Sequence, residues 1–285
     1  MILFKKAISI RHHIHEMKKN GLRVGWVPTM GALHEGHLSL IRAARKDCQL
    51  VVCSIFVNPT QFNDKKDFVK YPITIEKDIQ LLTENNVDLL FIPAVEEIYP
   101  GGTDGLESFD LGNLDKVLEG EFRPGHFQGV CQVMSRFIQI IEGHHLYMGQ
   151  KDYQQCMVIA RLLDILQVPT KLHLCPTERE PDGLAMSSRN MRLSGTERKD
   201  AIAIYEALSY IRKNLRAGPL NTLLEKASSI LLKKNFRIDY VSIADSRTLN
   251  PIQSWDGKQS VVALIAAYQG EVRLIDNVLL DTSVD

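Results

Sequence analysis

The sequence predicts an α/β protein, with a Rossmann-like parallel sheet in an N-terminal domain and a smaller α+β C-terminal domain. Strand and helix patterns alternate as far as about residue 176, which implies parallel strands joined by right-handed crossovers. After that point, two amphipathic helices precede strands joined by a tight turn, a pattern typical of an antiparallel sheet. We therefore place the two domains at residues 1–176 and 177–285.

The alternation begins with a short strand at residues 22–27 and a helix at 37–47, whose leucine and isoleucine residues cover one face. Residues 49–57 are apolar and β-branched, as in a strand buried on both faces. A helix is predicted at 74–86, beginning at a threonine suited to cap it. A further strand follows at 87–92 and is stopped by a proline.

Four more elements complete the first domain. Residues 126–141 are predicted as a helix and 144–148 as a strand. Residues 152–166 have apolar side chains at helical spacing, and 171–175 form a last short strand before a proline. Ligands of such sheets bind at the carboxyl ends of the strands, so the loops that follow the strands are the places to look for chemistry.

In the second domain, amphipathic helices are predicted at 194–215 and 220–234. Strands follow near 237–244, 261–268 and 272–279, and a Gln-Gly pair between the last two predicts a hairpin turn. Helices followed by antiparallel strands suggest a small α+β domain.

Composition narrows the class of function. Lysine plus arginine equals aspartate plus glutamate at 34 each, so net charge gives no pull toward nucleic acid or an anionic membrane. The five cysteines form no C-x-x-C pair, which argues against a disulfide framework or a zinc knuckle. The N-terminus does not resemble a signal peptide, and no apolar stretch is long enough to span a bilayer. We expect a cytoplasmic protein whose partners are small molecules.

The segment 30–37 follows the first predicted strand and joins it to a helix. Gly31 and Gly36 let backbone amides approach a ligand closely, and the helix start offers free N–H groups to phosphate. His34 and His37 are three residues apart, so in a first helical turn they share one face and can donate to phosphate oxygens. The alternative is an ordinary strand–helix turn with two incidental histidines.

Two further loops carry polar side chains. Asn58 and Gln61 place amides after a buried strand, where they can bind a carboxylate or hydroxyl, or merely cap the loop. Arg123 and His126 flank a Pro-Gly turn at a helix start, where they can face an anion. A plain turn is the competing interpretation.

The remaining two motifs suit a triphosphate. Lys151 stands between a strand and a helix, Asp152 can cap that helix, and Gln155 lies one turn further along. A surface lysine beside a cap is the alternative. The Ser187–Ser188–Arg189 sequence lies at the domain junction and suits a mobile phosphate clamp, although a serine-rich linker would look the same.

Together these motifs resemble those of the pantothenate synthetase family, within the wider H-x-G-H nucleotidylyltransferase superfamily. The resemblance covers essentially the whole chain, and the motifs occur in the family's order. They lie at residues 28–37, 58–62, 123–127, 149–155 and 182–190.

The resemblance implies an AMP-forming ligase that uses ATP and Mg²⁺ to join (R)-pantoate to β-alanine, giving pantothenate for coenzyme A biosynthesis. In the family, the pantoate carboxylate attacks the α-phosphorus of ATP and forms pantoyl-adenylate, with loss of pyrophosphate. The β-alanine amine then displaces AMP. No enzyme nucleophile is needed, in keeping with the lack of a credible Ser–His–Asp set. The family also suggests a homodimer.

The resemblance also implies roles for individual residues. His34, His37 and Lys151 are the expected catalytic residues, and Asp78 is the expected magnesium contact. The expected substrate-binding residues for pantoate and β-alanine are Gln61 and Gln155, with Asn58 assisting and with Arg123 and His126 as second-line groups around the pocket. The expected ATP contacts are Met30, Gly31, Ala32, Leu33, His34, Glu35, Gly36, His37, Gly149, Gln150, Lys151, Asp152, Glu178, Met186, Ser187, Ser188 and Arg189.

Two positions depart from the family pattern. Ile73 stands where the family commonly has arginine, and Glu178 stands where an apolar residue is usual. Two other functions fit part of the sequence. A phosphopantetheine or nicotinate-nucleotide adenylyltransferase shares the H-x-G-H turn but does not need Gln61 and Gln155. A non-catalytic nucleotide-binding regulator is expected to lose residues such as Lys151 or His37, which this chain retains.

Overall fold

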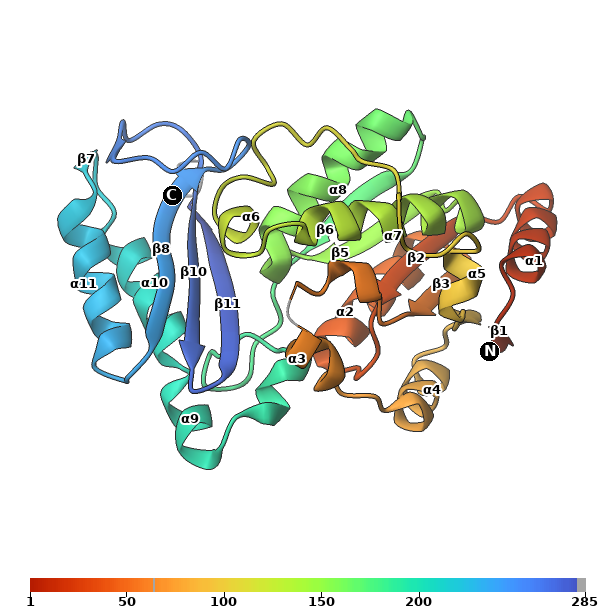
Figure 1. Ribbon diagram of the computed structural model, residues 1–285, viewed down its shortest axis with the longest axis horizontal. Helices are drawn as coiled ribbons and strands as arrows, with labels where there is room; N and C mark the ends of the chain where they lie inside the picture. Colours follow the sequence, from red (N-terminus) through yellow and green to blue (C-terminus); the bar gives the residue numbers. More distant parts are fainter. Residues whose placement is uncertain (64, 281–285) are drawn as a thin grey trace.

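A parallel six-stranded sheet forms the centre of the N-terminal part of the computed structural model, which describes residues 1–63 and 65–280 (Figure 1). Its strand order is β1-β4-β3-β2-β5-β6, and every pair is parallel. The strands are β1 (Ile2–Phe4), β2 (Val24–Thr29), β3 (Leu50–Ile55), β4 (Leu89–Phe91), β5 (His145–Gly149) and β6 (Lys171–Cys175).

Helices cover both faces of this sheet because successive strand residues point to opposite sides. On one face, Trp26 and Val52 pack with α1, α7 and α8; on the other, Val27 and Cys53 pack with α2 and α4. The helices of this part are α1 (Ala7–Lys19), α2 (Glu35–Asp47), α3 (Lys65–Val69), α4 (Ile75–Glu84), α5 (Val95–Ile98), α6 (Glu119–Phe122), α7 (His126–Ile141) and α8 (Tyr153–Leu166). Three short 3₁₀ turns lie in loops: η1 (Pro59–Gln61), η2 (Gln150–Asp152) and η3 (Ser188–Arg192).

The C-terminal part is an antiparallel sheet of order β11-β10-β8 with helices on one face (Figure 1). Its elements are α9 (Gly195–Asp200), α10 (Ala203–Asn214), α11 (Asn221–Leu232), β8 (Arg237–Asp245), β10 (Val261–Gln269) and β11 (Val272–Leu280), with the small pair β7 (Gly218–Pro219) and β9 (Ser254–Trp255). Residues such as Ala263 and Ile265 pack against α10 and α11. Val262 and Leu264 face the other way and pack against Leu118 and Tyr153. The C-terminal sheet is thereby docked on the N-terminal part.

This architecture confirms the predicted fold class, and it corrects some elements. The helix predicted at 194–215 is two helices, α9 and α10, because a tighter turn at Ala201 and Ile202 separates them. The edge strand β1 was not predicted, since three half-exposed residues give no periodic signal. Within the described residues, no helix is both long and apolar enough to cross a membrane.

The strand order indicates where a ligand site lies in this sheet. Strand β2 pairs with β3 on one side and with β5 on the other, so the chain winds in opposite directions from this point. In doubly wound sheets, ligands bind outside the carboxyl ends of the strands at such a switch point. The loops that leave β2 and β5 carry the H-x-G-H turn and Lys151, so these two predicted motifs lie at the switch point.

Candidate active site

The H-x-G-H turn after β2 is held by its own histidines. His34 is the N-cap of α2, and its Nδ1 accepts the Gly36 N–H at 3.2 Å. The Nδ1 of His37 accepts the His34 N–H at 3.3 Å, which completes a reciprocal cap. A Cβ on Gly36 would lie 2.9 Å from Cε1 of His34, so only glycine leaves room for that ring. The two imidazoles lie 4.1 Å apart between ring centroids, which confirms that they share one face.

These contacts determine the tautomer of both rings, and burial determines their charge. Because each Nδ1 accepts a backbone N–H, each neutral imidazole carries its proton on Nε2. Burial, together with the positive charge of Lys151, lowers the pKa of His34 to about 4. Burial also holds the pKa of His37 well below its usual value, and the nearby His34 and Lys151 lower it further. Both side chains are therefore neutral N–H donors near pH 7.

We expect the free energy of unfolding to fall as the pH is lowered from about 6.5 toward 5. Besides His34 and His37, burial lowers the pKa of His126 to about 3. In the unfolded chain these histidines take up protons below about pH 6.5, whereas in the folded protein they stay neutral, so acid favours unfolding by about 1.4 kcal/mol per pH unit for each histidine. Urea unfolding at pH 7, 6 and 5 measures this slope.

Replacing His126 with asparagine provides the control for this pH dependence. The substitution should reduce the slope by the contribution of one histidine, about 1.4 kcal/mol per pH unit. The carboxylate of Glu119, whose pKa the Arg273 guanidinium lowers to about 2 against the cost of burial, titrates at lower pH and does not contribute in this window. An unfolding free energy that does not change between pH 7 and 5 would contradict neutral, buried histidines.

Asp78, the expected magnesium contact, is bonded to the backbone of the H-x-G-H turn. It is fully buried, and its Oδ2 accepts the Ala32 N–H at 2.9 Å while Oδ1 accepts the Leu33 N–H at 2.8 Å. Oδ1 also accepts the Thr74 hydroxyl at 3.1 Å. Both oxygens are thus used on protein donors, and the carboxylate does not line the cavity between β2 and β5. Asp78 holds the H-x-G-H turn in place, and this geometry does not support the expected magnesium contact.

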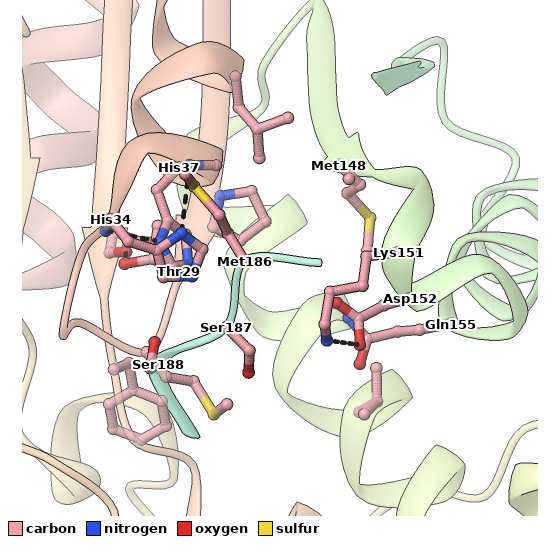
Figure 2. A pocket seen from close by; sticks show the side chains of 18 of the residues that line it. Thr29, His34, His37, Met148, Lys151, Asp152, Gln155, Met186, Ser187 and Ser188 are labelled. Atoms are coloured by element: carbon pink, nitrogen blue, oxygen red, sulfur yellow. Dashed lines mark hydrogen bonds and ion pairs between the residues drawn. The ribbon is translucent and has the colours of Figure 1, made fainter. Parts of the chain in front are cut away.

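A cavity of about 220 Å³ opens at the switch point, and the motifs line it from several sides. Figure 2 shows His34 and His37 on one wall and Lys151, Asp152 and Gln155 on the opposite wall. Segment 186–188 passes beside the histidines. Predicted site residues that line the cavity are Met30, His34, Gly36, His37, Asn58, Gln61, Gly149, Lys151, Asp152, Gln155, Glu178, Met186, Ser187, Ser188 and Arg189. The predicted residues that do not line it are Gly31, Ala32, Leu33, Glu35, Asp78, Arg123, His126 and Gln150.

Lys151 lies on η2, immediately after β5. Its side chain is 17% exposed, and its Nζ is 3.6 Å from Oδ1 of Asp152. This long pairing with a half-exposed carboxylate leaves the ammonium facing the cavity in Figure 2, where an anion can compete for it. The expected ATP contact Glu35, by contrast, forms an ion pair with Arg42 on the helix surface.

Gln61 and Gln155 give the cavity amide groups, and helix α7 gives it an apolar wall. Gln61 Nε2 lies 2.9 Å from Sδ of Met30. Buried Asn58 is used internally, since its Nδ2 donates to the Gly129 carbonyl at 3.1 Å and its Oδ1 accepts the Tyr99 hydroxyl at 2.8 Å. It shapes the loop that presents Gln61. The apolar wall consists of Val130, Val133, Met134 and Phe137.

Arg123 and His126 lie behind this wall rather than in it. His126 is buried, and its Nδ1 donates to the Gln61 carbonyl at 2.8 Å, so it supports the glutamine from behind. Arg123 lies 3.5 Å from Glu119 and lines two neighbouring cavities, of about 430 and 40 Å³. Neither side chain lines the cavity between β2 and β5. Both line the neighbouring space of about 40 Å³, in keeping with second-line groups around the substrate pocket.

The Ser187–Ser188–Arg189 segment closes one side of the cavity. The Ser188 hydroxyl donates to the Ala32 carbonyl at 3.0 Å, so this segment contacts the H-x-G-H turn. Arg189 is bound to Asp67 at 2.7 Å, as is Arg192. Sequence reasoning missed Asp67 because nothing local marks an aspartate on a short helix as the partner of arginines more than 120 residues away.

A doubly wound sheet with a cavity at its switch point, lined by both polar and apolar side chains, is typical of α/β enzymes that bind nucleotides. The family model described as pantoate-beta-alanine ligase matches residues 2–279, so the chain belongs to this family. Members of the family are ligases, which confirms both the resemblance and the enzyme class expected from the motifs.

Relatives support the assignment along the whole chain. Pantothenate synthetase from Thermotoga neapolitana is 45% identical over 93% of this chain and 94% of its own. The one from Azobacteroides pseudotrichonymphae is 41% identical over 98% and 99%. The crystal structure of pantothenate synthetase from Thermus thermophilus matches with a TM-score of 0.88 and 39% identity, covering 99% of this chain and all of that one. A pantoate-beta-alanine ligase from Francisella tularensis, described as complexed with beta-gamma ATP and beta-alanine, matches with a TM-score of 0.83 and 37% identity over 99% of both chains.

Proposed function

We propose that this chain condenses (R)-pantoate with β-alanine in two steps at the cavity between β2 and β5. In the first, a pantoate carboxylate oxygen attacks the α-phosphorus of ATP, and pyrophosphate leaves. In the second, the β-alanine nitrogen attacks the acyl carbon of pantoyl-adenylate, loses a proton and displaces AMP. The observation that carries the proposal is one cavity with the His34–His37 pair on one wall and Lys151 on the other.

The chemistry fits these side chains. Negative charge builds on the phosphate oxygens as pyrophosphate leaves, and neutral Nε2–H groups and an ammonium fixed in advance stabilise it. We assign the nucleotide to the H-x-G-H turn, the segment 149–152 and the segment 186–189. Gln61 and Gln155 are assigned to pantoate because amides bind a carboxylate and hydroxyls without adding charge. The apolar side chains of α7 complete that half of the cavity.

Magnesium is part of this proposal as a companion of the triphosphate, which it would neutralise. Mg²⁺ usually keeps several water ligands and binds through phosphates and one or two carboxylates. Asp152 and Glu178 are the carboxylates among the residues that line the cavity, so the donor set fits an ion carried mainly by ATP. The proposal also includes a cytoplasmic location and a homodimeric state. Size-exclusion chromatography with light scattering measures the oligomeric state.

An assay that omits each substrate in turn tests the proposal. With ATP, pantoate and β-alanine present, we expect AMP and pantothenate in equal amounts, and no AMP release in steady state when β-alanine is left out. Formation of ADP would exclude attack at the α-phosphorus. Release of pyrophosphate with a stable adenylylated product and no AMP would favour an adenylyltransferase instead.

Replacing Gln61 with alanine should raise the KM for pantoate by about 10-fold and the KM for ATP by less than about 2-fold. The reason is that loss of a buried amide leaves the polar groups of pantoate without a partner, a loss of roughly 1–3 kcal/mol. Initial rates against each substrate measure both constants. Gln80→Ala, on an exposed face of α4, is the control. A larger change for ATP would move Gln61 to the nucleotide half of the cavity.

A further inference from the structure

Asn277 of strand β11 is bonded to the turn that carries Lys151. It is 3% exposed, and its Nδ2 donates to the carbonyl of Gln150 at 2.9 Å and to that of Lys151 at 2.8 Å. Its Oδ1 lies 3.4 Å from Nε2 of Gln150. Both hydrogens of the amide nitrogen are therefore used on η2, which belongs to the other domain.

The preceding residue, Asp276, is bonded to a second segment that lines the cavity. It is 3% exposed and binds the two terminal nitrogens of Arg179 at 2.6 and 3.0 Å. Arg179 lies on the chain that runs from β6 to η3 and also donates to the Gly183 carbonyl at 3.0 Å. Asp276 Oδ1 in turn accepts the N–H of Asn277 at 2.8 Å. Two adjacent residues of β11 thus hold both segments.

Two neighbouring buried polar residues are unusual in a strand. Successive side chains of a strand point to opposite faces, and each buried polar group is costly unless it is hydrogen-bonded. Apart from the bond between Asp276 and the N–H of Asn277, the side-chain bonds described above reach Arg179, Gln150 and Lys151, all outside the C-terminal sheet. Their bonds thus fix the loops around the cavity relative to the C-terminal sheet.

We propose that Asn277 is a positioning residue for the ligase reaction and acts through Lys151. By holding the two carbonyls of η2, the amide fixes the direction in which the Lys151 side chain leaves the backbone. The ammonium is then oriented toward the phosphates of ATP before ATP binds. This inference rests on the proposed function only for the role that it gives to Lys151.

A double-mutant cycle tests this coupling in the full-length protein. We expect Asn277→Ala to lower the kcat of AMP formation by about 10-fold, with less than about 2-fold change in the KM for pantoate. When Lys151 is already alanine, the same substitution should cost less than about 2-fold more, because no ammonium remains to be positioned. Equal losses in both backgrounds would overturn the proposal.

Two variants separate positioning from general damage. Asn277→Asp keeps the size of the side chain but removes both donors, so it should lose as much kcat as alanine; full activity would contradict the proposal. Tyr240→Phe removes another partly buried bond between the domains, from Tyr240 to Glu119 at 2.8 Å, without touching η2, and should keep kcat within about 2-fold. If the wild-type protein forms no AMP, the proposed function fails. The same double-mutant cycle, measured as the binding affinity for a non-hydrolysable ATP analogue, still tests Asn277.

Discussion

Lys151→Ala is expected to lower the rate of AMP formation by about 10²-fold or more, as loss of one fixed transition-state donor does in other enzymes. Lys151 faces His34 and His37 across the cavity, and its long contact with Asp152 leaves it available to an anion. His37→Ala should have a loss of similar size, because the fixed Nε2–H group disappears. Single-turnover measurement of pyrophosphate release isolates this step from the later attack by β-alanine.

The control for the Lys151 substitution is Lys171→Ala, which removes an exposed lysine from the edge strand β6 and should leave the rate unchanged. Circular dichroism should show the same fold in all three variants, since Lys151 and His37 do not form the core. Near-normal turnover in both Lys151→Ala and His37→Ala would remove these side chains from the reaction.

The fold could be predicted largely because its elements are locally encoded. Helix α7 and strand β6 have the predicted bounds, since α7 follows a Pro-Gly turn and β6 stops at a proline. The break between α9 and α10 could not be predicted, because a single tighter turn leaves the apolar period almost unchanged. Strand β1 was missed because it is stabilised by pairing with β4, far along the chain.

The candidate site was predictable to the extent that its residues lie in short motifs at strand ends. His34, His37, Lys151 and Gln155 line one cavity because parallel strands bring their carboxyl ends to one edge. Residues that act through tertiary contacts gave no such signal. The polar Asp276–Asn277 pair inside an apolar strand was the one available hint, and its partners could not be deduced from sequence.

Asp78 makes contacts that the sequence alone could not indicate. An aspartate in the first turn of a helix near a predicted phosphate site suggests a metal contact, yet the sequence does not say whether its carboxylate faces the cavity or the backbone. The structure has it facing the backbone, where it accepts the N–H groups of Ala32 and Leu33. The Asp78 contact stabilises a turn with unusual backbone geometry, since Gly31, next to Ala32, has a φ of 78°.

Asp78→Ala is therefore expected to destabilise the protein itself, in the absence of ATP and magnesium. The substitution leaves two buried N–H groups without a partner, and each such donor costs about 1–3 kcal/mol, so the free energy of unfolding should fall by roughly 2–6 kcal/mol. That is a large part of the stability of an ordinary domain. Urea unfolding in the presence of EDTA measures the loss. Activity should fall as well, since the turn that carries His34 and His37 loses its anchor.

The matched control for Asp78 is Glu76→Ala, which removes an exposed carboxylate from the same first turn of α4 and should change the unfolding free energy by less than about 0.5 kcal/mol. Asp78→Asn distinguishes anchoring from metal binding, because an asparagine turned to accept one of the two N–H groups must present its own N–H₂ to the other. We expect it to lose stability without metal, and added magnesium should not restore its activity. A variant of unchanged stability whose activity returns at high magnesium would instead make Asp78 a metal contact.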